Sequence, residues 1–343
     1  DYDESAWAKQ SADFNHSPLN LVSASDENLA DHFIESVQQG EVMQFNAHGT
    51  ARYLLSRAVR DSGYKTVLAG EGSDELFAGY GFCRSAVLNA TNGGHSTGLT
   101  GGRLRTAFRL MRPSSSDQRA IAKTSRWLSR ASKVIDLPGW LTGSLAERLE
   151  LMRGVMLPDL LHRKRKVDPY KNLYDSLHAT DRLSGREPAK QLIYIWLKTV
   201  FPGYILAADR ADMAHGVEVR LPFLDHVLFE HVREIPVRAL AAGGENKYML
   251  RQAAAQYLSP ETRTRPKKPL MAPPFTPNSR SKLQSVIQDI VRSQSMREVP
   301  FFSSSAIAKL ADNSHDSNQR RGTEDPLLIM AASICVLQER YKL

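Results

Sequence analysis

A single turn between an expected strand and an expected helix constrains this chain most. The apolar residues 66–68 predict a short buried strand, and glycines and carboxylates crowd into the next residues before an apolar pattern resumes. Gly70 and Gly72 allow backbone N–H groups to approach a ligand closely, and such turns lie at the ligand-binding edge of open α/β sheets. Ser73 or Asp74 can cap the helix, and Asp74 can also hold a hard cation. An ordinary capped helix after a strand remains the alternative.

A second unusual stretch, residues 209–226, mixes many charges with an apolar segment at 221–224. An exposed surface does not normally place so many charges between apolar residues. We therefore expect buried ion pairs or the polar wall of a site here. A purely structural alternative stays open for Arg220 and Asp225, each of which can pin this segment to a neighbouring helix.

A third stretch, residues 245–251, opens a helix after two glycines. Helix N-termini favour anions because free N–H groups and the helix dipole point there. Lys247 can pair with a phosphate as a point charge, and Arg251 lies one turn later on the same face. A lone lysine at such a place is otherwise solvated surface. Four more basic residues follow, and they either close a phosphate site or lie exposed: Arg263, Arg265, Lys267 and Lys268.

Charge and cysteine content limit the classes of protein. The net charge of +8 over 343 residues suits nucleic acid, or equally a site for ATP and pyrophosphate. The basic run 162–166 lacks an accompanying aromatic ladder, so we read it as a solvated face or phosphate-facing loop and expect no nucleic-acid partner. Two cysteines, Cys83 and Cys335, argue against a disulfide framework or a cysteine metal site. The cytoplasm is the expected compartment.

Apolar periodicity and turn residues outline the remaining elements. No apolar run approaches the roughly 20 residues that cross a bilayer, and no signal peptide is visible, so no membrane association is expected. We expect a short strand at 16–22 that pairs in parallel with the strand at 66–68 through a right-handed crossover. The expected helices are 1–12, 26–38, 50–61 and 327–337, and the expected loops are 40–48, 91–102 and 312–322.

The helix at 50–61 is expected to be amphipathic, and residues 103–258 are helical in character. In the helix at 50–61, the residues expected to face inward are Leu54, Leu55, Ala58 and Val59. The arginines expected to point outward are Arg52, Arg57 and Arg60.

Three ordered motifs carry a family resemblance. Residues 70–80 read Gly-Glu-Gly-Ser-Asp-Glu-Leu-Phe-Ala-Gly-Tyr, residues 209–225 combine Asp-Arg with Glu-Val-Arg-Leu-Pro-Phe-Leu-Asp, and residues 247–251 read Lys-Tyr-Met-Leu-Arg. They resemble, in order, the signatures of the synthetase domain of the asparagine synthetase superfamily. Residues 3–8 and 53–57 also fit, so the resemblance runs from residue 1 to about residue 275. Five ordered matches are far more specific than any single one.

The resemblance implies an α/β fold of the ATP-pyrophosphatase, or adenine nucleotide α-hydrolase-like, type. Such a fold has a parallel sheet flanked by helices, here followed by a largely helical C-terminal part. We expect one synthetase-like domain over 1–343, with the parallel α/β part at 1–90 and the mainly helical part at 103–343. Because the first residue is Asp1 rather than Met, we expect a fragment of a longer or processed protein.

The resemblance also implies a reaction and its residues. A substrate carboxylate attacks the α-phosphate of Mg-ATP, pyrophosphate leaves, and ammonia or an amine attacks the acyl-adenylate. Asp74 would coordinate Mg²⁺, Lys247 would bind the transferring phosphates, and Glu71 would orient or deprotonate the amine. The other residues that would line the nucleotide site are Ala69, where the family usually has Ser, with Gly70, Gly72, Ser73 and Arg251.

Three departures from the family pattern shape the expectation. The pyrophosphate loop Ser-Gly-Gly-x-Asp-Ser is absent, and so is a glutaminase with its cysteine nucleophile; both are expected upstream of this chain. Asparagine-forming members carry an arginine six residues before Tyr53, a position filled here by Ala47. His48, the next residue, can contact a different acid or lie exposed, and the substrate acid need not be aspartate.

The sequence therefore predicts an ATP-dependent, AMP-forming amide ligase. Its expected cofactors are ATP and Mg²⁺. Its expected partners are a small carboxylic acid, ammonia or an amine, and an upstream glutaminase domain. A homo-oligomer is a further expectation that stays open. Two alternatives remain: a glutaminase-independent amine ligase or cyclase of natural-product biosynthesis, and a non-catalytic remnant of the fold. Glu71, Asp74 and Lys247 together argue against the remnant, which needs none of them.

Overall fold

The computed structural model describes residues 3–91, 151–163, 169–267, 281–313 and 321–342. The expected loop at 92–102, most of the basic run at 162–166, and Lys268 lie outside these residues. The described elements are α1 (Ser5–Phe14), α2 (Asp26–Gly40), α3 (His48–Asp61), β1 (Thr66–Leu68), α4 (Ser73–Leu76), α5 (Gly81–Thr91), α10 (Pro158–Arg163), α11 (Pro169–Ser176), α12 (Ala179–Arg182), α13 (Pro188–Met213), β2 (Glu218–Arg220), η2 (Pro222–Leu224), α14 (His226–Val232), α15 (Val237–Leu240), η3 (Ala242–Gly244), α16 (Tyr248–Ala253), η4 (Ala255–Tyr257), α17 (Pro260–Thr264), α18 (Lys282–Arg292), α19 (Gln294–Glu298), α20 (Ser304–Asn313) and α21 (Arg321–Tyr341).

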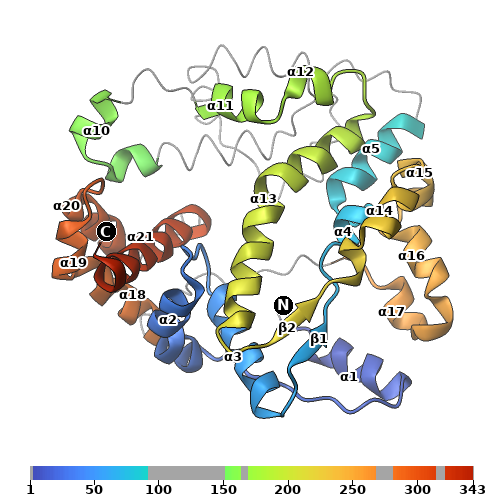
Figure 1. Ribbon diagram of the computed structural model, residues 1–343, viewed down its shortest axis with the longest axis horizontal. Coiled ribbons are helices and arrows are strands. Elements are labelled where there is room, and N and C mark those ends of the chain that lie inside the picture. The colour runs from blue at the N-terminus through green and yellow to red at the C-terminus, as the bar shows by residue number, and fades with distance from the viewer. Residues whose placement is uncertain (1–2, 92–150, 164–168, 268–280, 314–320, 343) are drawn as a thin grey trace.

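The described chain is mostly helical, and its largest core lies between α2, α18, α20 and α21 (Figure 1). Ser25 begins α2 as its N-cap by accepting a hydrogen bond from the backbone N–H of Asn28 at 3.2 Å. Phe33 and Val37, one turn apart, are buried in the same core cluster as Ile287 of α18. The helices expected at 26–38 and 327–337 are thus confirmed. The expected loop at 312–322 is shorter than predicted, since α20 and α21 occupy its ends.

The sheet within the described residues consists of two parallel strands, β1 and β2, with Val67 opposite Val219. The strand predicted at 66–68 is confirmed, but the prediction that it is buried is wrong. Leu68 is 74% exposed. It shares one face of the strand with Thr66, which is also exposed, so this face is not covered by the described residues. The strand order does place the end of β1 beside η2, where the signature turn begins.

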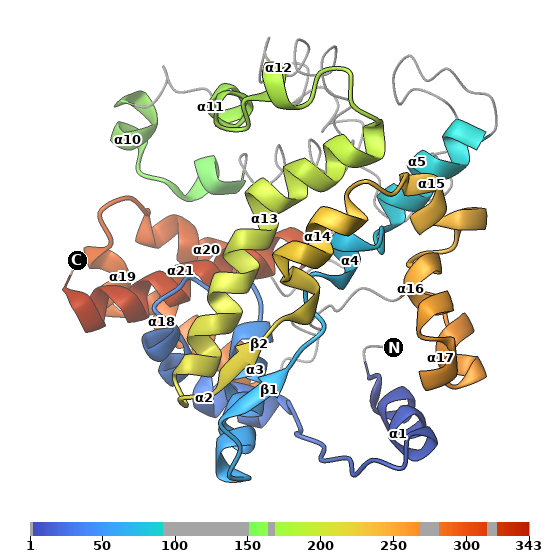
Figure 2. The same cartoon turned by 45° about the vertical axis from the view of Figure 1, so that its right-hand side comes forward.

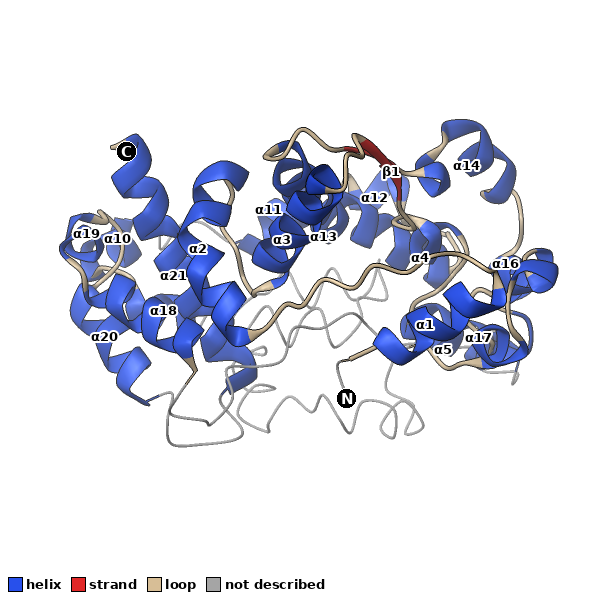
Figure 3. Cartoon of the chain, turned by 90° about the horizontal axis from the view of Figure 1, so that it is seen from below, coloured by secondary structure: helices blue, strands red, loops and turns tan. Residues whose placement is uncertain are grey.

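The segment expected as a strand at 16–22 is not a strand. It is exposed chain that connects α1 to α2 as a loop across the middle of the view from below (Figure 3). Its apolar residues, such as Leu21, face solvent. The segment has no neighbouring strand among the described residues, and an unpaired strand is not stable. The predicted parallel pair between 16–22 and 66–68 is therefore wrong, and the partner of β1 comes from residues 218–220.

Helix α13 crosses the middle of the molecule and contacts α3, α5 and β2 (Figures 1 and 2). By length and composition alone, it is the one helix among the described residues that passes a test for crossing a membrane. This finding corrects the expectation that no apolar run is long enough. It also packs against α2, and contact with these four elements is typical of a central helix, which needs an apolar surface for its neighbours.

Helix α3 begins at His48, two residues earlier than predicted, and packs against α13. Leu54 is buried as expected, whereas Leu55 is half exposed. Arg52 does not point out to solvent as predicted. Its side chain turns toward α13 and the end of β1, where two carboxylates receive it.

Candidate active site

The signature turn joins β1 to α4 and lies against η2. The Ala69 N–H donates to the Arg220 carbonyl oxygen at 3.0 Å and extends the β1–β2 ladder by one bond. Gly72 has φ of 90°, in the left-handed region, and a Cβ there would lie 2.3 Å from Leu224 Cδ2. Both the backbone conformation and this close approach require glycine. At Gly70 a Cβ would meet no atom within 4 Å, so the turn is open on that side.

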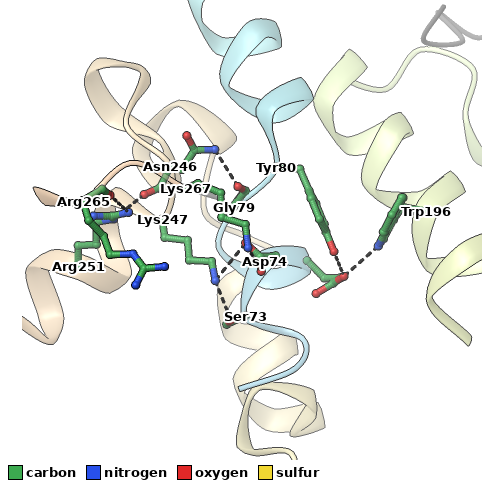
Figure 4. A network of polar contacts seen from close by, with 11 residues as sticks. Ser73, Asp74, Gly79, Tyr80, Trp196, Asn246, Lys247, Arg251, Arg265 and Lys267 are labelled. Atoms are coloured by element: carbon green, nitrogen blue, oxygen red, sulfur yellow. Dashed lines mark hydrogen bonds and ion pairs between the residues drawn. The ribbon is translucent and has the colours of Figure 1, made fainter. Parts of the chain in front are cut away.

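Ser73 and Asp74 bind lysines and do not cap α4, so that prediction is wrong; the N-cap is Gly72, without a side-chain hydrogen bond. Lys247 Nζ donates to Ser73 Oγ at 2.9 Å and lies 3.1 Å from Asp74 Oδ1. Lys267 Nζ lies 3.1 Å from Asp74 Oδ2 (Figure 4). Two ammonium groups share one carboxylate, and this corner therefore keeps an excess positive charge that suits an anion.

Lys247 reaches this corner from an unusual backbone conformation. It is the N-cap of the six-residue helix α16 and has φ of 54°, in the left-handed region that non-glycine residues rarely adopt. Strain of this kind costs about 1–3 kcal/mol and concentrates at functional sites. Burial lowers the pKa of the Lys247 ammonium, and the nearby Asp74 carboxylate opposes that shift.

Gly79 allows Asp74 and Lys247 to meet. A Cβ at Gly79 would lie 2.0 Å from Asp74 Oδ1 and 2.6 Å from Lys247 Cε. The Gly79 carbonyl oxygen accepts a hydrogen bond from Asn246 Nδ2 at 2.8 Å, which ties the turn before α5 to the segment that carries Lys247 (Figure 4). A larger residue at position 79 would separate the two charges.

Glu75 anchors the short helix α4 to α13. Its buried carboxylate accepts hydrogen bonds from the Tyr80 hydroxyl and, at 2.9 Å, from Trp196 Nε1 (Figure 4). Burial, together with the adjacent Glu75 carboxylate, raises the pKa of Tyr80, so the phenol remains a donor. The Tyr80 and Trp196 rings also pack 4.8 Å apart. These contacts hold the signature turn in place.

Arg251 is engaged with backbone carbonyl groups. Its guanidinium donates to the carbonyl oxygens of Asn246, Arg263 and Arg265, the first at 3.0 Å and the last at 2.9 Å. These bonds pin the segment that carries Lys267 beside the site. Nucleotide binding by Arg251 stays a prediction, and in this structure the side chain acts as a brace.

The N-terminal motif, residues 3–8, contacts the same 263–267 segment that Arg251 holds. Arg265 pairs with Glu4 and lies over the ring of Trp7, with its guanidinium carbon 5.3 Å from the ring centroid. Residues 3–8, which carried part of the resemblance, therefore hold the 263–267 segment from the outside.

Glu71 lies in a charged cluster that the sequence did not reveal. Arg52 Nη1 donates to Glu71 Oε1 at 2.7 Å, and Arg52 also binds Asp212, with Nε 2.9 and 3.0 Å from its two oxygens and Nη2 2.7 Å from Oδ2. Burial raises the pKa of Asp212, and the Arg52 guanidinium opposes that shift. We call Arg52, Glu71 and Asp212 the arginine clamp.

A pocket of about 420 Å³ opens beside the arginine clamp. Asp209 adds a third carboxylate to its polar side. Its apolar side is formed by α13 and by the segment from β2 to η2, through Phe201, Pro202, Ile205, Leu206, Val219, Leu221 and Leu224. The pocket thus combines an acidic end with an apolar wall, a combination that small-molecule sites commonly have.

The charges of the 209–226 stretch divide into two groups. Asp212 forms the expected buried ion pair, with α3. Arg220 pairs with Glu218 on its own exposed strand, and Asp225 caps α14 by accepting from the Leu228 N–H at 2.8 Å. The structural alternative is therefore confirmed for Asp225, which ties the segment to the adjoining helix α14. Arg220 makes its ion pair within its own strand and not with a helix.

The residues near Asp74 fit a magnesium nucleotide. The described residues contain no group of three or more His, Cys, Asp or Glu side chains placed to hold a metal. Mg²⁺ in nucleotide sites needs only one or two protein carboxylates, since phosphates and water complete its shell. Asp74 Oδ1 is buried and accepts no hydrogen bond, although Lys247 Nζ lies 3.1 Å away. Such an oxygen suits a metal ion, while the two lysines suit its phosphates.

The sequence identified some of these residues and missed others. The sequence identified Ser73, Asp74 and Lys247, which meet at what we call the lysine corner. It also identified Glu71, which lies in the same turn but belongs to the arginine clamp. Lys267 was singled out without a definite role. The residues missed were Arg52, Gly79, Asp212 and Asn246. The available signal for Asp212 was its place in the charged 209–226 stretch, where buried ion pairs were expected.

Sequence comparison finds similar proteins over nearly the whole chain. The sequence model of the family described as asparagine synthase matches residues 1–335. "Amidase chry2" of Gibberella zeae is 27% identical over 99% of this chain and 51% of its own length. "Amidase chyE" of Penicillium rubens is 26% identical over the same shares. A "Putative asparagine synthetase [glutamine-hydrolyzing]" of Mycobacterium tuberculosis is 28% identical over 59% of this chain and 29% of its own. The chain spans about half the length of the two fungal relatives.

Proposed function

Because the chain belongs to the asparagine synthase family, we propose that it is the synthetase part of an ATP-dependent, AMP-forming amide ligase. The observation that carries the proposal is the meeting of Lys247, Ser73 and Asp74 around one turn. Lys247 lies 174 residues from Ser73 along the chain, yet its Nζ is 2.9 Å from the hydroxyl. The fold brings together a cation, a hydroxyl and a carboxylate that can bind a metal ion, although they are far apart in sequence. This combination suits the phosphates of ATP.

The first half-reaction is adenylation. An oxygen of the substrate carboxylate forms a bond to the α-phosphorus of ATP, and the bond to the β-phosphate bridging oxygen breaks, so pyrophosphate leaves. Lys247 and Lys267 hold the leaving phosphates by exchanging their contacts with Asp74 for contacts with phosphate oxygens. Asp74, released from the lysines, would hold the Mg²⁺ that neutralises the pyrophosphate. Ala69, Gly70 and Gly72 border the nucleotide with backbone atoms.

The second half-reaction forms the amide. The nitrogen nucleophile attacks the acyl carbon, AMP leaves, and Glu71 accepts a proton from the attacking nitrogen. Glu71 Oε1 is occupied by Arg52, and Oε2 has no hydrogen-bond partner among the described residues, so it can receive that proton. Ammonia released from glutamine by an upstream glutaminase is the proposed donor. We place that glutaminase and the pyrophosphate loop in the part of the protein that corresponds to the other half of the fungal relatives.

A second candidate is an amine ligase of natural-product biosynthesis. The pocket beside Glu71 favours it, because an apolar wall serves no purpose for ammonia but suits a substrate with an apolar body. The two fungal relatives named as amidases are consistent with amide chemistry outside asparagine formation.

The test measures the two half-reactions in the whole protein, upstream half included. Exchange of labelled pyrophosphate into ATP is followed with a panel of carboxylic acids, among them aspartate. We expect at least one acid to support exchange and Asp74→Asn to abolish it. Amide formation from glutamine, ammonium chloride or a panel of amines then separates the two candidates. No exchange with any acid would refute the proposal and favour a non-catalytic remnant.

A further inference from the structure

We propose that Arg52 is the positioning residue of Glu71: fixed by Asp212, it holds one oxygen of the Glu71 carboxylate and leaves the other for the nitrogen nucleophile. The inference rests on the proposed function, in which Glu71 accepts a proton in the second half-reaction. It assigns a role to two residues, Arg52 and Asp212, that the signature motifs did not mark.

The geometry of the arginine clamp supports this division of work. Nε and Nη2 of Arg52 face the Asp212 carboxylate side by side, whereas Nη1 alone faces Glu71. The two-pronged contact fixes the plane of the guanidinium. The Nη1–H bond, at 2.7 Å, then fixes where Glu71 Oε1 lies. A lysine offers a single charged atom and cannot hold both carboxylates in this way.

Burial makes the clamp more than a surface ion pair. The side chains of Asp212 and Glu71 are 5% and 12% exposed, and that of Arg52 is 21% exposed. Asp212 is fixed in turn, because Ser56 Oγ donates to its backbone carbonyl oxygen at 3.2 Å. The three partners come from α3, α13 and the signature turn, so the clamp holds these three elements together at the edge of the pocket.

Other charged and titratable groups facing the two carboxylates do not replace Arg52. Asp209 adds a negative charge at the pocket. Tyr204, also on α13, is near both carboxylates, and burial together with Glu71 raises its pKa, so it stays neutral. Among the described residues, Arg52 is the cation that forms ion pairs with Glu71 and Asp212. Without it, the two buried carboxylates would lose that partner and still face Asp209 and Tyr204.

The inference predicts unequal losses in the two half-reactions. In the full-length protein, with ammonium chloride as the donor, Arg52→Met is expected to lower amide formation about 100-fold more than it lowers pyrophosphate exchange, because a misplaced catalytic group costs about that much. Asp212→Asn should act in the same direction through a loosened guanidinium. Arg52→Lys should recover part of the loss by restoring the charge.

The pH profile gives a second readout that a merely structural residue would not move. Removing Arg52 leaves two neighbouring carboxylates that hold a proton to higher pH. The acidic limb of amide formation should therefore move up by about one unit or more in Arg52→Met, and move back in Arg52→Lys.

A matched control exists on the surface. Arg233 also lies between two carboxylates, 2.8 Å from Glu230 and 3.2 Å from Glu234, but all three side chains are more than half exposed. Arg233→Met should leave both half-reactions and the pH profile as in the unmodified protein. Equal losses of exchange and amide formation in Arg52→Met, with an unmoved acidic limb, would overturn the inference while leaving the proposed function intact. Absence of exchange in the unmodified protein would instead remove the proposed function.

Discussion

Gly79 offers the sharpest test of the lysine corner, because a single methyl group added there must disturb it. In Gly79→Ala the new Cβ would lie 2.0 Å from Asp74 Oδ1, 2.6 Å from Lys247 Cε and 2.8 Å from the Asp74 backbone Cα. Carbon and oxygen atoms that are not bonded prefer separations of about 3.5 Å. The carboxylate and the lysine must therefore move apart by an ångström or more.

A displacement of about 1 Å at a catalytic group can cost about 100-fold in rate, equivalent to about 2.7 kcal/mol of transition-state stabilisation. We expect Gly79→Ala to lower pyrophosphate exchange by about that factor and to weaken binding of Mg-ATP, measured by calorimetry. Overpacking should also lower the free energy of unfolding by about 1–3 kcal/mol.

Gly81→Ala is the matched control, since a Cβ at Gly81 would meet nothing within 4 Å. It should leave exchange, nucleotide affinity and stability close to those of the unmodified protein. Normal exchange and normal Mg-ATP affinity in Gly79→Ala would refute the reasoning, because they would mean that Asp74 and Lys247 need not approach each other as closely as the structure shows.

Three further predictions concern stability, pH and thiol reactivity. Asp212→Ala should lower the free energy of unfolding by about 3 kcal/mol in urea titrations, the lower end for a buried pair because Arg52 keeps 21% of its side chain exposed; a loss below 1 kcal/mol would place the pair with surface ion pairs. Burial lowers the pKa of Lys247 from its ordinary 10.5, so nucleotide affinity should fall as the pH rises through that lowered value. In Lys247→Arg the affinity should stay constant to higher pH, because the guanidinium keeps its charge there; parallel pH profiles of the two proteins would contradict this. Burial raises the pKa of Cys83 and Cys335 to about 12, so at pH 8 only about 10⁻⁴ of each thiol is ionised, and thiol reagents should label the protein by mass spectrometry after denaturation but not before.

Local chemistry explains the elements that the sequence predicted correctly. The capped helix that starts at Asp26 and the apolar helix over 327–337 follow from residue spacing and end signals. The tight turn after β1 was predicted from its glycines, whereas the left-handed φ of Gly72 is a finding of the structure. The segment at 16–22 has an equally suitable local pattern but no strand beside it, and a strand requires a partner.

The sequence by itself determined several helices, among them those at 26–38, 50–61 and 327–337, the order of the three motifs and the residue types that suit phosphate and metal binding. Only the tertiary structure decided which charges meet. Arg52 reaches Asp212 across 160 residues of chain, and Lys267 reaches Asp74 across 193. Helical periodicity tells whether a residue lies on a polar or an apolar face, but it says nothing about a partner on another element. The pairing of Glu71 with Arg52, and of Asp74 with two lysines, follows from the packing of α3, α13 and α16 around the end of one short strand.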